Sequence, residues 1–335
     1  MLGLRSVGEL AGILRTTPRR LYSIADTIDG YVHFYELLDP ANPKRKARIV
    51  LNPMGELRRI QFRLLHDLFR RRLRPSPFSF GGVPGRSATQ NATQHIQSQF
   101  IYTTDIQNFF PSISQWRVRE MFQSRLDCSA DVSQLLARLC TYKGHLAQGL
   151  ITSPILADRA VHRVDVRIAG LCESHRLSYT RFVDDITVSG WFSFDLDKSG
   201  IVSLIRRIMN ECGFQIAQHK EQTGEVANGD VAVTGLRIIR GHLDPTADYI
   251  HRLETQLESH RKLGQGDQLV GPLFTKQQLR GRVEYVCAIN RNRSRTLRQK
   301  FGLIDWSAVE AIVVERGLIV CRKSLIPLKT LSSMH

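Results

Sequence analysis

The spacing of apolar residues predicts three helices in the first part of the chain. Residues 57–73 place apolar side chains on one face and arginines on the other, so they should form an amphipathic basic helix that ends before Pro75. Two shorter helices are expected ahead of it, over residues 7–15 and 18–28. These two would form a short helical extension at the N-terminus.

Two apolar, β-branched runs, at residues 100–106 and 178–188, have the character of buried strands. The second run carries an Asp pair in its middle. Helical spacing fills the interval between them, at residues 116–140 and 155–175, and the chain after Asp248 is expected to be mostly helical. The order of strand, helices and strand predicts an α+β fold in which an antiparallel sheet is covered by helices on one face.

The composition is that of a globular protein with a basic surface. With 335 residues, 42% of them hydrophobic, the chain is long enough for a well-buried core and about two domains. Lys and Arg number 47 against 31 Asp and Glu, and the net charge of +16 favours a polyanionic partner such as nucleic acid. No run of about 18 apolar residues is present, and Arg5 and Glu9 interrupt the stretch that a signal peptide would need. Neither membrane integration nor secretion is expected.

Cysteine usage indicates a reducing compartment. The six cysteines lie at least 12 residues apart and form no CxxC pair of the kind that zinc and redox sites use. We therefore expect reduced core thiols in a cytoplasmic protein, at Cys128, Cys140, Cys172, Cys212, Cys287 and Cys321.

The positive charge is concentrated in two stretches. Residues 44–74 contain eleven basic and two acidic residues, and residues 276–300 contain eight basic residues and one acidic residue. Each stretch could be a solvated helix face. Both are rich in arginine, however, and the guanidinium fork suits phosphate, so contact with a nucleic-acid backbone is the functional interpretation.

Three carboxylates interrupt the two strand runs. Asp105 lies near the end of the first run, and Asp184 and Asp185 lie within the second. An Asp pair alone is more often the polar tip of a hairpin. Charges on buried strands are costly unless they are paired or bind metal, so three of them call for a reason. If the strands are neighbours, Asp105 and Asp184 would meet and could hold two Mg²⁺ ions for an in-line phosphoryl displacement.

Three segments resemble, in order and in spacing, the A, B and C motifs of reverse transcriptases: IYTTDIQNFFPSIS (101–114), AQGLITSPILADRA (147–160) and YTRFVDDITVSG (179–190). Two more are similar to motif D and to the basic fingers motif: CGFQIAQHK (212–220) and ARIVLNPMGELRRIQ (47–61). Two short segments resemble signatures of the retron subgroup: NATQH (91–95) and VTGLRI (233–238).

The resemblance implies catalytic roles for a small set of residues. Asp105 and Asp184 would bind the metal ions, with Asp185 in support, and the backbone carbonyl of Ile106 would complete a metal site. Lys220 would be the general acid for the pyrophosphate leaving group. Taken alone, a single lysine is more often a surface residue.

Other residues would bind the incoming dNTP. Arg48 would clamp the triphosphate, with Lys44 or Lys46 as a second cation. Phe110 would be the steric gate against a 2′-hydroxyl, although an isolated aromatic is more often part of the core. Two motif B residues would pack on the nucleotide and template, and the second would permit a close backbone approach: Gln148 and Gly149.

The resemblance also implies a right-hand polymerase. Residues 1–39 would form the N-terminal helical extension and residues 40–99 the fingers, with an insertion at about 115–147. Residues 100–243 would form the palm and residues 244–335 a helical thumb. The two basic stretches would then lie on either side of the palm and grip a duplex through its phosphates.

Retron resemblance implies a cognate structured non-coding RNA that is both template and primer. Synthesis would start from a guanosine 2′-hydroxyl and yield branched multicopy single-stranded DNA (msDNA), in an antiphage role with a separate effector protein. RNA recognition is expected at the two signatures and in the second basic stretch: Asn91, His95, Thr234, Gly235, Arg291, Arg293 and Arg295.

Two departures from the retron pattern keep other interpretations open. Motif C has Phe182 and Val183 where Tyr-Ala is usual, and motif B has Ala147 where proline is common. Another stand-alone bacterial reverse transcriptase, group II intron-like or defence-associated, would share the chemistry. A catalytically silent RNA-binding scaffold is a third possibility, disfavoured because the three carboxylates, Gln148 and Lys220 occur together.

Overall fold

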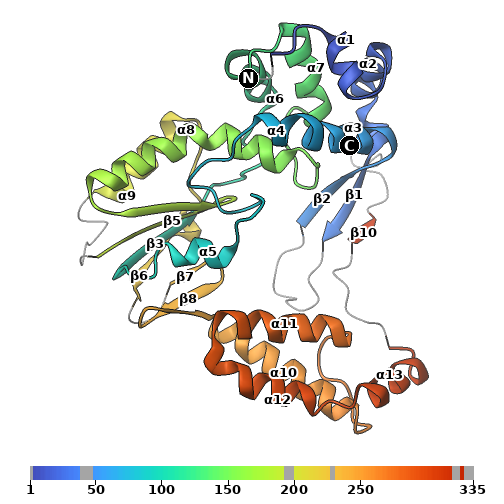
Figure 1. Cartoon of the computed structure of the whole chain (residues 1–335), viewed down its shortest axis with the longest axis vertical. Helices are drawn as coiled ribbons and strands as arrows, with labels where there is room; N and C mark the ends of the chain where they lie inside the picture. Colours follow the sequence, from blue (N-terminus) through green and yellow to red (C-terminus); the bar gives the residue numbers. More distant parts are fainter. Residues whose placement is uncertain (1–2, 38–47, 192–199, 227–230, 319–324, 328–335) are drawn as a thin grey trace.

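The computed structural model describes residues 3–37, 48–191, 200–226, 231–318 and 325–327 (Figure 1). These residues form three antiparallel sheets and a larger number of helices. The α+β fold class expected from the sequence is confirmed. The fingers-motif lysines Lys44 and Lys46, and parts of the expected extension, fingers, palm and thumb ranges, lie outside the described residues.

The N-terminal part consists of two helices and a three-stranded sheet. The helices begin where the sequence predicts, because Ser6 and Thr17 cap them by accepting hydrogen bonds from the backbone N–H groups of Glu9 and Arg20. The sheet has the order β10-β1-β2, so a strand from the end of the chain pairs with one from its beginning. The elements are α1 (Val7–Ile13), α2 (Pro18–Asp26), β1 (Val32–Leu37), β2 (Arg48–Pro53) and β10 (Leu325–Pro327).

The amphipathic basic helix follows β2 and is continuous through residue 72. It comprises α3 (Gly55–Arg63), a π-helical stretch η2 (Leu64–Phe69) and α4 (Arg70–Arg72). Its apolar face is buried, as the periodicity predicts. Gln61 on this face donates to the Leu139 carbonyl at 2.9 Å and accepts from the Ile151 amide at 3.0 Å. These bonds fix the helix against the segment that contains motif B.

The central sheet has the order β4-β5-β3-β6 and is antiparallel throughout. Its strands are β4 (Ser178–Phe182), β5 (Asp185–Gly190), β3 (Phe100–Asp105) and β6 (Gln222–Glu225). The single strand expected at 178–188 is therefore wrong. The segment folds into a β-hairpin that turns at Val183 and Asp184, because Val183 adopts a φ of +61° that no strand can continue through.

Helices cover one face of this sheet, as expected. Tyr102, Ile186 and Val188 belong to the large hydrophobic core that also contains apolar residues of α8 (Ser153–Ser174) and α9 (Ile201–Glu211). In Figure 1 these two helices lie along the same side of the sheet. The expected helical run at 116–140 lies in the same core but is broken into α6 (Gln115–Glu120), the π-helical η3 (Met121–Arg125) and α7 (Ala130–Cys140).

The opposite face is partly covered by a smaller layer. Helix α5 (Ala88–Thr93) and the sheet β7 (Ala232–Val233), β8 (Leu236–Ile239) and β9 (His242–Pro245) share a separate hydrophobic cluster with Ile101 of β3. Side chains alternate between the two faces of a strand. Asp105 is four residues from Ile101, so it lies on this second face and away from α8 and α9.

The last part of the described chain is helical, which confirms the expectation for residues after Asp248. Helices α10 (Ala247–Leu263), α11 (Lys276–Ile289), α12 (Ser294–Gly302) and α13 (Trp306–Glu315) surround their own hydrophobic core. Figure 1 shows them at the opposite end of the molecule from α1 and α2. Strand β10, also within the range expected to be thumb, instead joins the N-terminal sheet.

The sequence also led to predictions about membrane insertion and about the state of the cysteines. No helix among them is long and apolar enough to cross a membrane. Their five cysteines are unpaired, and all but Cys212 are buried. The remaining cysteine, Cys321, lies outside the described residues.

Candidate active site

The three carboxylates meet at one end of the central sheet. Strands β3 and β5 are paired so that Asp105 lies directly opposite Asp185. The Ile106 amide donates to the Asp184 carbonyl at 2.9 Å, which holds the hairpin turn beside the end of β3. The expectation that the two carboxylate-bearing segments are neighbours is therefore confirmed, even though the Asp pair is also a hairpin tip.

The carboxylates differ in their affinity for protons. Burial raises the pKa of Asp184 and of Asp185, and the negative charge of Asp105 raises both further. Burial also acts against ionisation of Asp105, but hydrogen bonds with Asp185 and Lys220 outweigh it and lower the pKa of Asp105. Three adjacent negative charges therefore repel one another, and a cation is needed to keep them all ionised.

In this structure Lys220 supplies such a cation. It ends the short helical turn η4 (Gln218–Lys220), and its ammonium group forms an ion pair with Asp105. The preceding segment is fixed to β3, since the Ala217 amide donates to the Asp105 carbonyl at 2.8 Å and the Gln107 amide donates to the Gln215 carbonyl at 2.8 Å. The motif D lysine is thus placed by the strand that carries the first carboxylate.

The chemistry of these donors fits a divalent metal ion. Carboxylate oxygens are the hard ligands that Mg²⁺ prefers, and it usually keeps water or substrate phosphates as its other ligands. Among the residues that the structure describes, no three acidic, His or Cys side chains already form a metal cage. In this structure the Lys220 ammonium group pairs with one oxygen of Asp105, so it would compete with a metal ion for that oxygen.

Asp184 and Asp185 line a cleft of about 910 Å³, and Asp105 lines a neighbouring hollow together with Asp185 and Lys220. The walls of the cleft come from β2, the segment after β3, the motif B segment, the β4–β5 turn and the η4 turn. The cleft brings together most residues that the sequence assigns to the chemistry and to dNTP binding: Arg48, Ile106, Phe110, Gln148, Asp184, Asp185 and Lys220. Arg48 is close enough for its charge to favour ionisation of Asp105 and Asp184.

Gly149 permits a close approach, but to a different partner from the one expected. Its φ is +104°, and a Cβ there would clash with the Leu51 carbonyl. The Leu51 amide donates to the Gln148 carbonyl at 2.9 Å. In this structure the glycine therefore brings β2 against the motif B segment, and β2 begins with Arg48.

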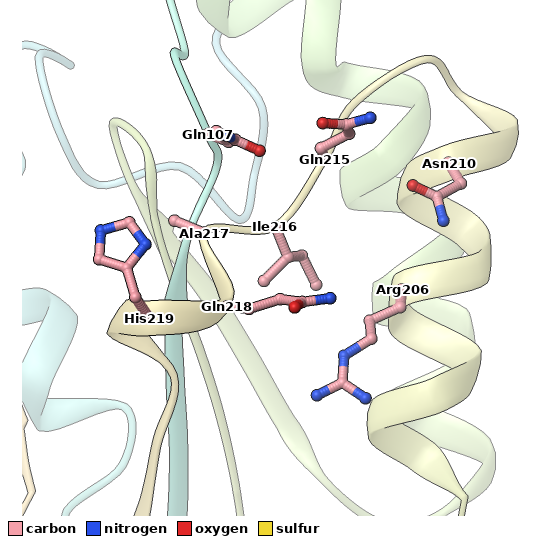
Figure 2. A pocket seen from close by; sticks show the side chains of 8 residues that line it. All are labelled: Gln107, Arg206, Asn210, Gln215, Ile216, Ala217, Gln218 and His219. Atoms are coloured by element: carbon pink, nitrogen blue, oxygen red, sulfur yellow. The ribbon is translucent and has the colours of Figure 1, made fainter.

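A second hollow lies behind the η4 segment and borders the cleft. Its volume is about 590 Å³, and no residue assigned from the sequence lines it. Figure 2 shows its lining: Gln107, Arg206, Asn210, Gln215, Ile216, Ala217, Gln218 and His219. Three of these residues also line the cleft: Gln107, Ala217 and His219. The segment 215–219 therefore separates the two spaces.

Asn91 and His95 do not face solvent. Both are fully buried between α5 and the central sheet. The His95 ring lies 2.7 Å from the Ser189 hydroxyl through Nδ1 and 2.7 Å from the Thr180 hydroxyl through Nε2. Burial lowers the pKa of His95 to about 3, so the ring is neutral at physiological pH. In this structure neither side chain is exposed to contact RNA: His95 holds the segment after α5 against the sheet, and the side-chain amide of Asn91 is buried with no hydrogen-bond partner among the described residues.

The other retron signature lies at the mouth of the site. Thr234 and Gly235 form the turn between β7 and β8, and both have positive φ. The Thr234 hydroxyl donates to the Ala88 carbonyl at 3.1 Å. The turn lines a hollow of about 440 Å³ together with Asp105 and Lys220. The turn therefore lies beside the first carboxylate and the motif D lysine.

The three arginines of the second basic stretch that are expected to recognise RNA have unequal surroundings. Arg293 forms a bidentate ion pair with Asp244, with N···O distances of 2.9 and 2.8 Å, and so ties the η6 turn (Arg291–Arg293) to β9. Arg291 and Arg295 are exposed, and neither has a partner among the described residues. Only the latter two are free to bind phosphate in this structure.

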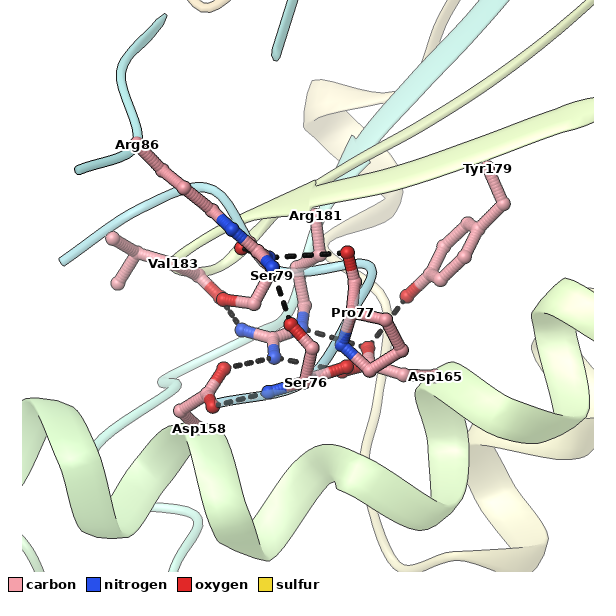
Figure 3. A network of polar contacts seen from close by, with 9 residues as sticks. All are labelled: Ser76, Pro77, Ser79, Arg86, Asp158, Asp165, Tyr179, Arg181 and Val183. Atoms are coloured by element: carbon pink, nitrogen blue, oxygen red, sulfur yellow. Dashed lines mark hydrogen bonds and ion pairs between the residues drawn. The ribbon is translucent and has the colours of Figure 1, made fainter. Parts of the chain in front are cut away.

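Sequence reasoning missed a buried ion cluster beside the catalytic turn. Arg181 of β4 pairs with Asp158 and Asp165 of α8, and all three are at most 9% exposed (Figure 3). A signal was present in the sequence. Asp158 and Asp165 are seven residues apart, hence on one helix face, among the apolar residues that the periodicity assigns to the core.

Comparison with known proteins identifies the family. Residues 43–249, more than half of the chain, match the family described as reverse transcriptase (RNA-dependent DNA polymerase). The chain is 32% identical over 186 residues to the retron Ec86 reverse transcriptase of Escherichia coli, covering 56% of this chain and 57% of that protein. It is 30% identical over 253 residues to the retron Mx65 reverse transcriptase of Myxococcus xanthus, covering 70% and 56%.

A third relative, the retron Se72 reverse transcriptase of Salmonella heidelberg, is 26% identical over 241 residues, covering 70% of this chain and 62% of that protein. The matches thus span little more than half the length of these relatives. The aligned region contains the carboxylates, the cleft and the motif D lysine. Members of the matched family generally use divalent metal ions, which agrees with the donors found here. The chain belongs to the reverse transcriptase family.

Proposed function

We propose that this chain is the RNA-directed DNA polymerase of a retron, which copies a cognate structured non-coding RNA into msDNA. One observation carries the proposal: Asp105 lies opposite Asp185 at the end of the paired strands, and Asp184 and Asp185 line a cleft that also contains Arg48 and Lys220. The three relatives are retron reverse transcriptases by name, which supports the retron assignment.

The proposed chemistry is nucleotidyl transfer with two Mg²⁺ ions. Bound in this site, the ions would activate the attacking hydroxyl and stabilise the leaving oxygen. Asp105, Asp184 and the Ile106 carbonyl would be the ligands, and Asp185 would support them. Arg48 would bind the triphosphate of the dNTP. Once Lys220 has left Asp105, its ammonium group would protonate the pyrophosphate leaving group.

The proposed division follows a right hand. Residues 40–99 and about 115–147 would be the fingers, residues 100–243 the palm and residues 244 onward the thumb. Support comes from the separate core of α10–α13 and from the position of the central sheet between these helices and α3 (Figure 1). The exposed arginines of the second basic stretch would then lie in the thumb, where duplex phosphates pass.

The proposed biology is that of the retron subgroup. Synthesis would begin at a guanosine 2′-hydroxyl of the non-coding RNA, in the cytoplasm, and the branched product would act with a separate effector protein in antiphage defence. Support for these points is the resemblance of NATQH and VTGLRI to retron signatures, together with the names of the relatives.

The test is to express the chain in its native host, purify it and sequence the nucleic acid that copurifies. We expect one structured RNA joined through a 2′–5′ linkage to a short DNA, whose synthesis the purified protein repeats with dNTPs. Extension of an annealed primer without any branched product would favour another stand-alone reverse transcriptase. Failure to extend any primer would favour an RNA-binding scaffold.

Phe110→Ala is expected to increase incorporation of ribonucleotides. Phe110 is half-buried and lines the cleft, so removing its ring removes the steric clash with a 2′-hydroxyl. The measurement is the ratio of kcat/KM for dNTP to that for rNTP, which should fall by at least about tenfold. Phe122 is fully buried and does not line the cleft, so Phe122→Leu is the matched control that should leave the ratio unchanged. An unchanged ratio for Phe110→Ala would assign its ring to the core alone.

The double variant Arg291→Gln/Arg295→Gln is expected to bind RNA more weakly than wild type, with little change in its folding stability. Both side chains are exposed and have no protein partner among the described residues. Each lost phosphate contact should reduce the slope of log K against log salt by about 0.7 to 0.9. Arg298→Gln, which removes an exposed arginine paired with Glu284, is the control. Equal slopes for wild type and the double variant would exclude these phosphate contacts.

A further inference from the structure

The turn that carries Asp184 has a backbone conformation that its own residues do not favour. Val183 has a φ of +61°, a region that β-branched residues rarely occupy. Such a conformation persists only where the surrounding structure holds it, and it is found most often at functional sites. The contacts that hold this turn therefore bear on the position of Asp184.

One of these contacts comes from a buried guanidinium. Arg181 is 1% exposed and donates through Nη1 to the Val183 carbonyl at 2.7 Å. Its other donors bind α8: Nε and Nη2 each lie 2.8 Å from Asp165, and Nη2 lies 2.7 Å from Asp158. Figure 3 shows the guanidinium between the helix and the turn. The longest described helix is thus joined directly to the backbone of the turn.

The second set of contacts comes from the loop at residues 76–86. This loop pairs with β4 at the arginine itself, since the Phe80 amide donates to the Arg181 carbonyl at 2.7 Å and the Arg181 amide donates to the Phe78 carbonyl at 2.8 Å. Its Gly81 then packs on the turn. A Cβ at Gly81 would lie 2.5 Å from the Val183 amide nitrogen, so only glycine fits there.

The loop itself is fixed to the same ion cluster. The Ser76 amide donates to Asp158 at 3.0 Å. The Arg86 side chain closes the loop by donating to the carbonyls of Ser76, at 2.9 Å, and Pro77, at 3.1 Å. Helix, loop and turn therefore share one hydrogen-bond network (Figure 3).

We propose that Arg181 and Gly81 are positioning residues for the catalytic turn, which together set where Asp184 stands relative to Asp105. The proposal rests on the proposed metal-binding role of Asp184. A buried ion pair by itself adds little stability over apolar residues of the same size, so stability alone does not explain the cluster. What apolar residues could not supply is the hydrogen bond to the Val183 carbonyl.

The first test uses Gly81→Ala, which adds one methyl group against Val183. A displaced turn should lower kcat, by on the order of 10²-fold for a shift of about 1 Å, while the KM for primer–template stays unchanged. The matched control is Ser79→Ala in the same loop, whose buried hydroxyl has no partner among the described residues. Wild-type kcat in Gly81→Ala, with folding confirmed by its melting temperature, would overturn the proposal.

The second measurement does not depend on activity. Mn²⁺ is titrated into the protein alone and followed by electron paramagnetic resonance. Gly81→Ala should bind Mn²⁺ at least several-fold more weakly than wild type, and Ser79→Ala should bind it equally. A substitution that only destabilised the fold would leave the metal site of the folded molecules unchanged, so weaker Mn²⁺ binding would indicate a displaced Asp184. Unchanged Mn²⁺ affinity in Gly81→Ala would contradict a role in placing Asp184.

Arg181→Lys separates position from charge. Lysine keeps the positive charge beside Asp158 and Asp165, but its single ammonium group lacks the fork that reaches both α8 and the turn. We expect a folded protein with kcat and Mn²⁺ affinity reduced as in Gly81→Ala. Full activity in a folded Arg181→Lys would show that charge balance is sufficient and would overturn the assignment of Arg181.

Asp184→Asn, assayed in parallel, tells the two hypotheses apart. If Asp184→Asn is inactive and Gly81→Ala is normal, the positioning proposal is wrong and the proposed function stands. If Asp184→Asn remains active, the proposed catalytic role itself is wrong.

Discussion

Asp184→Asn is expected to abolish DNA synthesis while the protein remains folded. The substitution keeps the size of the side chain and removes the charge that would bind metal, and metal-ion stabilisation of a phosphoryl transfer is worth several kcal/mol. The rate should therefore fall by on the order of 10²- to 10³-fold. Single-turnover primer extension measures this loss directly.

The same substitution should not lower the thermal stability of the protein, although it abolishes activity. Burial and the charge of Asp105 raise the pKa of Asp184, so its ionised form costs folding free energy at neutral pH. A neutral amide removes that cost, and the melting temperature without metal should be equal or higher. Asp131→Asn, at an exposed position on α7, is the matched control. Synthesis by Asp184→Asn at a rate near that of wild type would exclude Asp184 as a metal ligand.

Gly149→Ala is expected to raise the KM for dNTP strongly. An added methyl group would clash with the Leu51 carbonyl, so β2 must move away from the motif B segment, and Arg48 at the start of β2 moves with it. A displacement of about 1 Å can cost on the order of 10²-fold in a positioned interaction. Steady-state kinetics with varied dNTP would show the change, and primer–template affinity should be almost unaffected.

The control for Gly149→Ala must separate the effect of the clash with the Leu51 carbonyl from the effect of placing alanine at a positive φ. Gly271 also has a positive φ, of +89°, but a Cβ there would have no heavy atom within 4 Å. Gly271→Ala should therefore lose a similar amount of stability through its φ while keeping the KM for dNTP. If the two variants show the same KM, the contact between β2 and motif B does not position Arg48.

The sequence predicts many of the helices and strands because their positions follow from local patterns of apolar and polar residues. Helix α8 begins two residues before the predicted segment, and α10 begins one residue before Asp248, after which helices were predicted. The meeting of Asp105 with Asp184 could also be anticipated, since it requires only that two apolar strands pair. Periodicity and the cost of burying charge were sufficient for these conclusions.

The features that escaped prediction depend on contacts between distant segments. No Asn-Gly or Asp-Gly pair marks the β4–β5 turn, so the segment read as one strand. His95 reads as a polar surface residue until Thr180 and Ser189 are placed beside it by the sheet. The tie between Arg181 and Asp165 likewise exists only once α8 lies on β4.

The pairing of β3 with β5 restricts where the chain can change in length. An insertion or deletion of one residue between Ile101 and Asp105 would rotate Asp105 to the other face of the sheet, toward α8 and Asp165. A change of two residues would keep the face but move Asp105 away from its partner Asp185. Insertions and deletions in natural variants of this chain are therefore expected to lie in the connections outside this ladder.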